Sequence, residues 1–290
     1  MLGIGLIGCG AVSAAMFVPG LDDETKIMLF GALGTIVLMT VFSAISKIPQ
    51  DMEYHNFADQ RHLCGVVPNY MDVLSNAPFF FVGALGLAAL RPDTYPASEI
   101  LQVWEAIPNV PSFRNLNIKT EEEREAWVVF FVGVLFVSFG SGYYHWYRTS
   151  KTLVWDRLPM TIAFMSTFAL QCMERLGQKA ACVLYPAILI GAASVFLWDR
   201  TDDLRLYAVV QFFPLVSMPL LIAGFDPQYT RSDLLLVALG FYVLCKIVEL
   251  YDRQIFALTR GIISGHTLKH LAAAVSPFVA LYYLSVRASL

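Results

Sequence analysis

Residues 264–284 read SGHTLKHLAAAVSPFVALYYL, an apolar stretch long enough to cross a membrane that nevertheless contains His266 and His270. Histidine is costly inside a bilayer, and such residues usually face a bundle interior, a cavity or a metal. Because the two histidines are four residues apart, one helix face presents both rings toward a common point. The stretch therefore predicts a helix whose first turns bring two imidazoles together.

A second stretch of this kind, residues 136–147, reads FVSFGSGYYHWY and adds Ser141 and His145. Neutral imidazole is the commonest metal ligand in proteins, and three imidazoles would leave one zinc coordination position open to water. That arrangement is typical of a catalytic zinc site rather than a structural one. A single intramembrane histidine is more simply explained by hydrogen bonding, but three beside an aspartate favour zinc bound by His145, His266 and His270.

The composition of the 290-residue chain indicates a membrane protein. Hydrophobic residues make up 57% of it and charged residues only 15%, whereas a soluble domain carries roughly 25% charge. The net charge of −3 gives no reason to expect nucleic-acid binding, and the five scattered cysteines receive no role. We therefore predict an all-α, multi-pass integral membrane protein.

Eight apolar segments are each near the ~20 residues needed to cross a hydrocarbon core. Seven of them follow residue 70, which predicts a seven-helix core domain at 71–290, preceded at 1–70 by an extra helix and a polar loop. Residues 1–18 are also apolar, and a short span, a re-entrant piece and a signal sequence are all open there. The expected spans are 26–46, 71–91, 126–147, 153–172, 180–198, 204–223, 232–251 and 264–286.

Alternating the direction of successive spans brings the unusual polar residues to one side of the membrane. The span at 126–147 ends, and the spans at 153–172 and 264–286 begin, on the side that holds the polar loop 47–70. Asp156, in the segment LVWDRLPM, lies at the start of the span at 153–172. Lysine and arginine divide almost evenly between the two sides, so the positive-inside rule gives no orientation.

Asp156 and Ser141 would supply the other groups that a metal hydrolase needs. Zinc held by neutral ligands can bring the pKa of its water to about 7, and Asp156 is placed to take that proton and pass it to a leaving amine. The Ser141 hydroxyl could donate to the oxyanion formed at an attacked carbonyl. An interfacial ion pair between Asp156 and Arg157, and close helix packing at the GSG sequence around Ser141, are the alternatives.

Two charged clusters have simple explanations. Residues 121–123 are three glutamates before an apolar segment, as expected for the first turn of a helix. Glu249 follows Lys246 by three residues, so an ion pair on one helix face is a simpler interpretation than a carboxylate that steadies a metal-binding imidazole.

Taken in order, SGYYHWY, VWDRLPM and GHTLKHL resemble the motifs of the alkaline ceramidase family, within the larger CREST group of seven-helix membrane hydrolases. That family has Ser-x-x-x-His at the end of its second helix, Asp followed by Leu-Pro-Met at the start of its third, and His-x-x-x-His at the start of its seventh. The resemblance covers about residues 71–286, and the extra helix at 26–46 departs from it. The matching residues are Ser141 and His145, Asp156 with residues 158–160, and His266 and His270.

The resemblance implies a zinc amidase that cleaves the N-acyl bond of a membrane lipid, ceramide, into a sphingoid base and a fatty acid. It implies that the three histidines bind zinc, that Asp156 handles protons and that Ser141 binds the oxyanion. Members of the family also carry an N-terminal calcium site. The oxygen donors that match it here are Asp51, Glu53, Asn56 and Asn69.

The calcium match is partial. Calcium takes six to eight oxygen ligands, which carboxylates and amides can supply. At least one position where the family has an acid is Asn69 or Tyr54 here, so a solvated polar loop is the alternative.

Two other functions remain open. A receptor-like member of the same group, similar to the adiponectin and progestin receptors, would share the serine, aspartate and histidines; the four residues after the last expected span disfavour it. A proton-coupled transporter would use Asp156 and the histidines as a proton relay. The lack of inverted repeats and of paired broken helices counts against a transporter.

Overall fold

The computed structural model describes residues 2–18 and 20–290, and over these ranges the chain is all helical, without a β-strand. A helix satisfies its backbone hydrogen bonds within one segment, which is what an apolar surrounding requires. In chain order the elements are α1 (Leu2–Ala15), α2 (Asp23–Ala44), η1 (Met52–His55), α3 (Tyr70–Leu74), α4 (Ala77–Leu90), α5 (Ala97–Glu105), α6 (Glu121–Trp146), α7 (Ser150–Leu176), η2 (Gln178–Val183), α8 (Leu184–Thr201), α9 (Arg205–Gly224), α10 (Asp233–Leu250), α11 (Asp252–Leu258) and α12 (Gly265–Val286).

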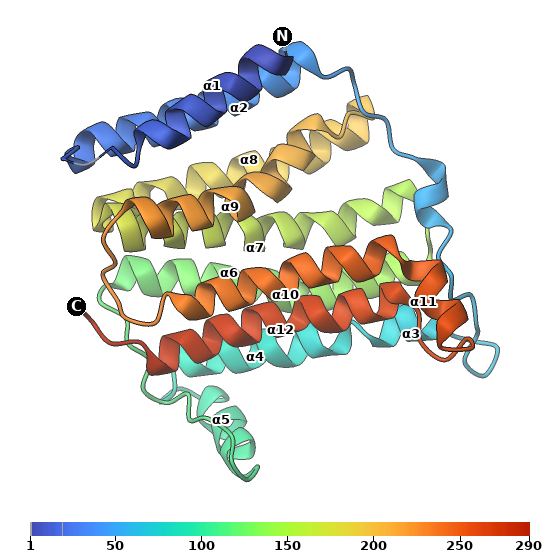
Figure 1. Cartoon of the computed structure of the whole chain (residues 1–290). Coiled ribbons are helices and arrows are strands. Elements are labelled where there is room, and N and C mark those ends of the chain that lie inside the picture. The colour runs from blue at the N-terminus through green and yellow to red at the C-terminus, as the bar shows by residue number, and fades with distance from the viewer. Residues whose placement is uncertain (1, 19) are drawn as a thin grey trace.

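The long helices lie roughly side by side in one bundle. Figure 1 shows α1 and α2 along one edge, next to α8 and α9, with α4 and α12 at the opposite edge. Helix α6 packs closely against α7, and α10 against α12. The connection from α2 to α4, including η1 and α3, gathers with α11 at one end of the bundle, which we call the loop end (residues 45–76 and 251–264), whereas α5 projects near the other end (Figure 1).

Within residues 2–18 and 20–290, five segments are long and apolar enough to span a membrane, and a sixth qualifies if α10 and α11, which meet at a 77° bend, form one broken span. The sequence predicted eight. Helices α7 and α12 lie where two of the eight were expected, but they are less apolar because they carry Asp156, Lys269 and the paired histidines. The five segments are Glu24–Ala44, Tyr70–Leu90, Glu121–Trp146, Gln178–Thr201 and Arg205–Gly224.

Three shorter helices fall outside the predicted spans. Helix α1 packs against α2. Its 14 residues extend about 21 Å at 1.5 Å per residue, which is less than the ~30 Å hydrocarbon core. Helices α5 and α11 occupy segments that the sequence predicted only as connections.

Side-chain caps fix where α7 and α12 begin. The Thr149 hydroxyl accepts from the backbone N–H of Thr152 at 3.2 Å, and the Thr152 hydroxyl accepts from that of Thr149 at 3.1 Å. Ser264 caps α12 by accepting from the backbone N–H of Thr267 at 2.9 Å. Such caps satisfy N–H groups that the helix itself leaves unpaired, and here they set both helix starts at the loop end.

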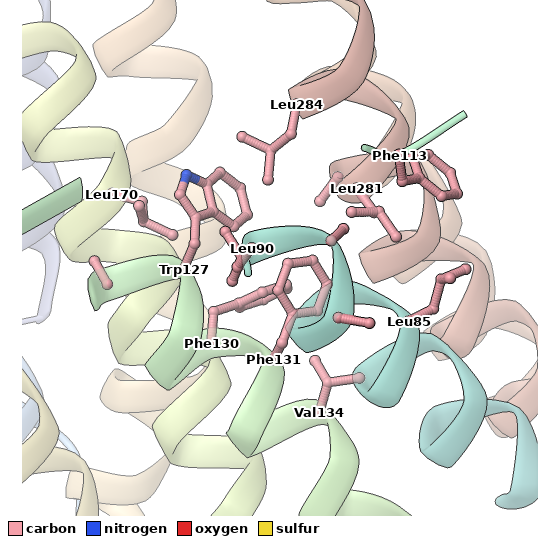
Figure 2. Packing of buried hydrophobic residues seen from close by; sticks show 14 of the residues in the cluster. Leu85, Leu90, Phe113, Trp127, Phe130, Phe131, Val134, Leu170, Leu281 and Leu284 are labelled. Atoms are coloured by element: carbon pink, nitrogen blue, oxygen red, sulfur yellow. The ribbon is translucent and has the colours of Figure 1, made fainter. Parts of the chain in front are cut away.

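The main hydrophobic core lies between α4, α6, α7 and α12, and it includes much of the first half of α6. Figure 2 shows Trp127, Phe130 and Phe131 of α6 packed among leucines of α4 and α12. Helix α6 begins at Glu121, which confirms that the three glutamates form a first helical turn. Close packing of this kind holds helices together in a membrane, where lipid tails compete with apolar contacts.

Gly140 allows α6 and α7 to approach beside the candidate site. A methyl group at position 140 would overlap the backbone carbonyl of Trp155 on α7. We expect Gly140→Ala to lower the stability of the folded protein by about 1–3 kcal/mol, measured by thermal unfolding in detergent. Gly142→Ala is the matched control, since nothing lies within 4 Å of a methyl group there. Equal stability of the two variants would contradict the close approach.

Candidate metal centre

Three buried histidines meet at the loop end of the bundle. His145 comes from the last turn of α6, and His266 and His270 come from the first turns of α12. One ligand atom from each ring lies within 4.8 Å of the other two. The Nε2 atoms of His145 and His266 are 3.1 Å apart, near the ~3.3 Å expected between two nitrogens on one tetrahedral zinc with Zn–N of about 2.0–2.1 Å. The donor set therefore fits zinc.

The break between α3 and α4 brings Ser75 to His270. The Ser75 hydroxyl oxygen lies 2.8 Å from Nδ1 of His270. A partner on one ring nitrogen orients the imidazole and leaves Nε2 for a metal. Nδ1 of His145, by contrast, is buried and has no hydrogen-bond partner among the described residues.

Ser75→Ala should weaken zinc binding about 10- to 100-fold, as is typical when the partner of a metal-binding imidazole is removed. The measurement is competition for zinc between the purified variant and a chromogenic chelator. Ser138→Ala is the control, because the Ser138 hydroxyl bonds only the carbonyl of Leu135 within α6. Zinc affinity unchanged by Ser75→Ala would show that this contact does not support the site.

Two carboxylates hold the first turn of α12. Oδ1 of Asp252 accepts from the backbone N–H of His266 at 2.7 Å, and its Oδ2 accepts from that of Ala58 at 2.9 Å. Oδ1 of Asp72 accepts from the Thr267 hydroxyl at 2.9 Å. Negative charge is favourable at a helix N-terminus, so Asp252 stabilises the turn that carries His266, and Asp72 anchors the same turn through Thr267.

Asp156 and Ser141 lie together on facing helices. Both residues are buried, and both line the same cavity. Arg157 is engaged elsewhere, since its Nη2 donates to Oε1 of Gln50 at 2.8 Å and its guanidinium lies 4.1 Å from the ring centre of Trp198. Among the described residues, Arg157 forms no ion pair with Asp156 within 4 Å, so the structure does not support the interfacial pair.

Lys269, between the two histidines of α12, adds a buried ammonium. Its Nζ lies 3.3 Å from Nε2 of His266 and 2.8 Å from Oε1 of Glu249. The other carboxylate oxygen of Glu249 pairs with Lys246 at 2.9 Å, which confirms the ion pair predicted from their spacing. Since Lys269 has three N–H groups, one remains beyond those that face Glu249 and His266, and it could serve a ligand beside the histidines.

An apolar cavity of about 150 Å³ extends from these residues into the bundle. Ser141, Asp156, Lys269 and His270 line it at the loop end, and its walls come from α4, α6, α7, α9, α10 and α12. A few polar groups gathered at one end of an apolar cavity suit a mostly apolar ligand with a polar group at one end.

Phe57 and His55, from the connection between α2 and α3, cover the histidines. The Phe57 ring centre lies 4.2 Å from that of His266 and 4.9 Å from that of His145. Nδ1 of His55 lies 2.8 Å from the hydroxyl oxygen of Tyr144. Burial is the main cause that lowers the pKa of His55 below its usual value, which keeps this ring neutral at pH 7.

The residues predicted to bind calcium have different surroundings. On η1, Oδ1 of Asp51 accepts from the backbone N–H of Glu53 at 2.9 Å, and Nδ2 of Asn56 donates to Oε2 of Glu53 at 3.1 Å. Asn69 is buried, and its Nδ2 donates to the backbone carbonyl of His145 at 2.9 Å. Asn69 thus supports the histidine site, whereas calcium binding stays a prediction.

Sequence reasoning missed Lys269, Ser75 and the two aspartates that hold α12. Lys269 carried a signal, because an ionisable residue inside an apolar helix is usually functional. Ser75 carried none, since its contact depends on a helix break whose position the sequence does not reveal. Asp72 and Asp252 lie at segment ends, where acidic residues are common and unremarkable in sequence.

No protein-family model, no curated protein and no solved structure matches this chain.

Proposed function

We propose that this protein is a zinc-dependent amidase of the membrane that hydrolyses the N-acyl bond of ceramide-type lipids. The observation that carries the proposal is the meeting of three imidazole nitrogens, within 4.8 Å of one another, at the polar end of an apolar cavity. Asp156 and Lys269 line the same end. The resemblance of the sequence motifs to alkaline ceramidases supports the choice of an N-acyl lipid.

The position of the site suits a lipid substrate. Five or six helical segments in the described part of the chain are long and apolar enough to cross a bilayer, and we propose that the chain is a multi-pass membrane protein. The amide of a ceramide lies at the base of its headgroup, between polar and apolar surroundings. The polar residues of the site occupy the corresponding position, at one end of the bundle, and the cavity leads away from them among apolar side chains.

His145, His266 and His270 would hold the zinc. When bound, zinc supplies an activated water and polarises the carbonyl to be attacked. Asp156 takes a proton from water and delivers one to the amine as the C–N bond breaks, because an unprotonated amine anion is a poor leaving group. Ser141 lines the cavity beside this carboxylate.

We assign the oxyanion donor to Lys269 as well as to Ser141 of α6. A serine hydroxyl offers one neutral donor, whereas an ammonium offers three N–H groups and a positive charge. The Lys269 ammonium keeps one N–H group beyond its contacts with Glu249 and His266, and it lines the same end of the cavity. A positive donor fixed beside the reacting carbonyl stabilises the charge that develops on its oxygen.

Lys269→Met should lower kcat about 10²–10³-fold, the usual cost of losing one oxyanion donor, with little change in zinc content. Lys246→Met is the matched control, because Lys246 pairs with the same Glu249 but is not within bonding distance of a histidine nitrogen. Partial recovery in Lys269→Arg would support a role for the positive charge. Loss of bound zinc in Lys269→Met would instead make Lys269 a structural residue.

The direct test is release of fatty acid from ceramide by the purified protein, before and after removal of zinc with a chelator. We expect release to stop on chelation and to return when zinc is restored. Other N-acyl lipids are assayed in parallel, so that the amidase reaction and the choice of ceramide are tested separately. No release from any of them, with zinc bound in a one-to-one ratio, would overturn the proposal.

A further inference from the structure

Two residues at the far end of the cavity each carry a buried polar atom without a partner. Trp127 on α6 is 4% exposed and Gln171 on α7 is 3% exposed, and both line the cavity. The indole Nε1–H of Trp127 and the side-chain Oε1 of Gln171 are buried and have no hydrogen-bond partner among the described residues. Buried polar groups are nearly always hydrogen-bonded, so an unpaired donor and an unpaired acceptor in one cavity point to a ligand.

These two residues lie at a similar depth, far from the histidines. Helices α6 and α7 are joined by a short turn and run antiparallel, so residues equally far from the turn lie opposite one another. Trp127 precedes Ser141 by 14 residues on α6, or about 21 Å along the helix. Gln171 follows Asp156 by 15 residues on α7, or about 22 Å. The unpaired atoms therefore mark the end of the cavity opposite the candidate metal centre.

The surroundings of these atoms are otherwise apolar. Figure 2 shows Trp127 with its nitrogen on the side of the ring that faces Leu170, the neighbour of Gln171 on α7. Phe130, Val134 and other apolar side chains line the cavity between its two ends. Thr167 also lines it, but its hydroxyl already donates to the carbonyl of Ala163 at 2.9 Å. An ordinary hydrocarbon tail would leave both unpaired atoms unsatisfied.

We propose that Trp127 and Gln171 form a subsite for a hydroxyl group near the far end of the substrate's acyl chain. This inference rests on the proposed function, which places the acyl carbonyl at the histidines. A hydroxyl is an acceptor for the indole N–H and a donor for the amide oxygen, so it suits both unpaired atoms. The subsite lies about 21 Å from the acyl carbonyl, which is farther than the ~15 Å thickness of one leaflet of the hydrocarbon core. Only a long acyl chain in an extended conformation would span that distance.

The test measures binding of free fatty acids to the full-length zinc-loaded protein in detergent, by displacement of a fluorescent fatty acid. We expect ω-hydroxypalmitic acid to bind about tenfold more tightly than palmitic acid, the size of one or two buried hydrogen bonds. The preference should disappear in Gln171→Leu and in Trp127→Phe, and persist in Thr167→Val. ω-Hydroxylauric acid, whose hydroxyl falls short of the subsite, should show no advantage over lauric acid.

Equal affinity for palmitic and ω-hydroxypalmitic acids in the wild type would overturn the inference, as would a preference that survives both Gln171→Leu and Trp127→Phe. The binding assay does not need turnover. A hydroxyl preference without hydrolysis of any N-acyl lipid would therefore count against the amidase and leave the subsite standing. Hydrolysis of an N-acyl lipid without the hydroxyl preference would count against the subsite and leave the amidase standing.

Discussion

His266→Ala is expected to lose its zinc, with a fall in affinity larger than the 10- to 100-fold that follows loss of an outer partner of a metal ligand. His266 supplies one of three nitrogens, and its Nε2 lies 3.1 Å from that of His145. With one imidazole gone, two protein ligands remain, fewer than the three that catalytic zinc sites use. Metal content after dialysis against a defined zinc concentration gives the measurement, beside turnover of ceramide.

The control for this variant is His62→Ala, which removes an exposed histidine from the same connection that covers the site. It should keep its zinc. Circular dichroism and gel filtration check that both variants remain folded. Unchanged zinc in a folded His266→Ala protein would refute the assignment of the ligands.

Asp156→Asn is expected to lower turnover by about 10²–10⁴-fold, the range for loss of a general acid–base group, while zinc content stays near that of the wild type. Asparagine has a similar shape and stays polar, but it cannot carry a proton. Measuring turnover and zinc content on the same sample separates a loss of proton transfer from a loss of the metal.

Asp199→Asn is the matched control, since Asp199 lies near the end of α8 and, among the residues that the structure describes, its only ion-pair contact is a 3.9 Å approach to Arg200. It should leave turnover unchanged. A folded Asp156→Asn protein with wild-type activity would remove Asp156 from the mechanism.

The sequence predicted the long helices well because each is a continuous apolar segment. Helices α6, α9, α10 and α12 begin and end within a few residues of the expected spans. Helices α5 and α11 were missed, since they are short and lie in polar connections. The bend of 77° between α10 and α11 was also missed, because no proline or glycine marks Tyr251, where α10 ends.

Part of the candidate site was predictable from the sequence, because it depends on positions within single apolar segments and on their order. Spacing on one helix gave His266 and His270, and the alternation of spans brought Asp156 to the same end. Contacts between distant segments were not predictable, because they depend on the approach of backbones. Ser75 contacts His270 in this way, and Asn69 donates to the backbone carbonyl of His145.

Asp252 has a consequence for how a substrate gains entry. One of its carboxylate oxygens accepts from the backbone N–H of Ala58, in the connection that covers the histidines, and the other accepts from that of His266 on α12. Asp252 therefore links the covering connection to the helix that carries His266. A substrate that entered from the aqueous side would have to break these two hydrogen bonds, which would displace His266. Lateral entry from the hydrocarbon core of the membrane, between neighbouring helices, leaves both hydrogen bonds intact. It is the route we expect for a water-insoluble substrate.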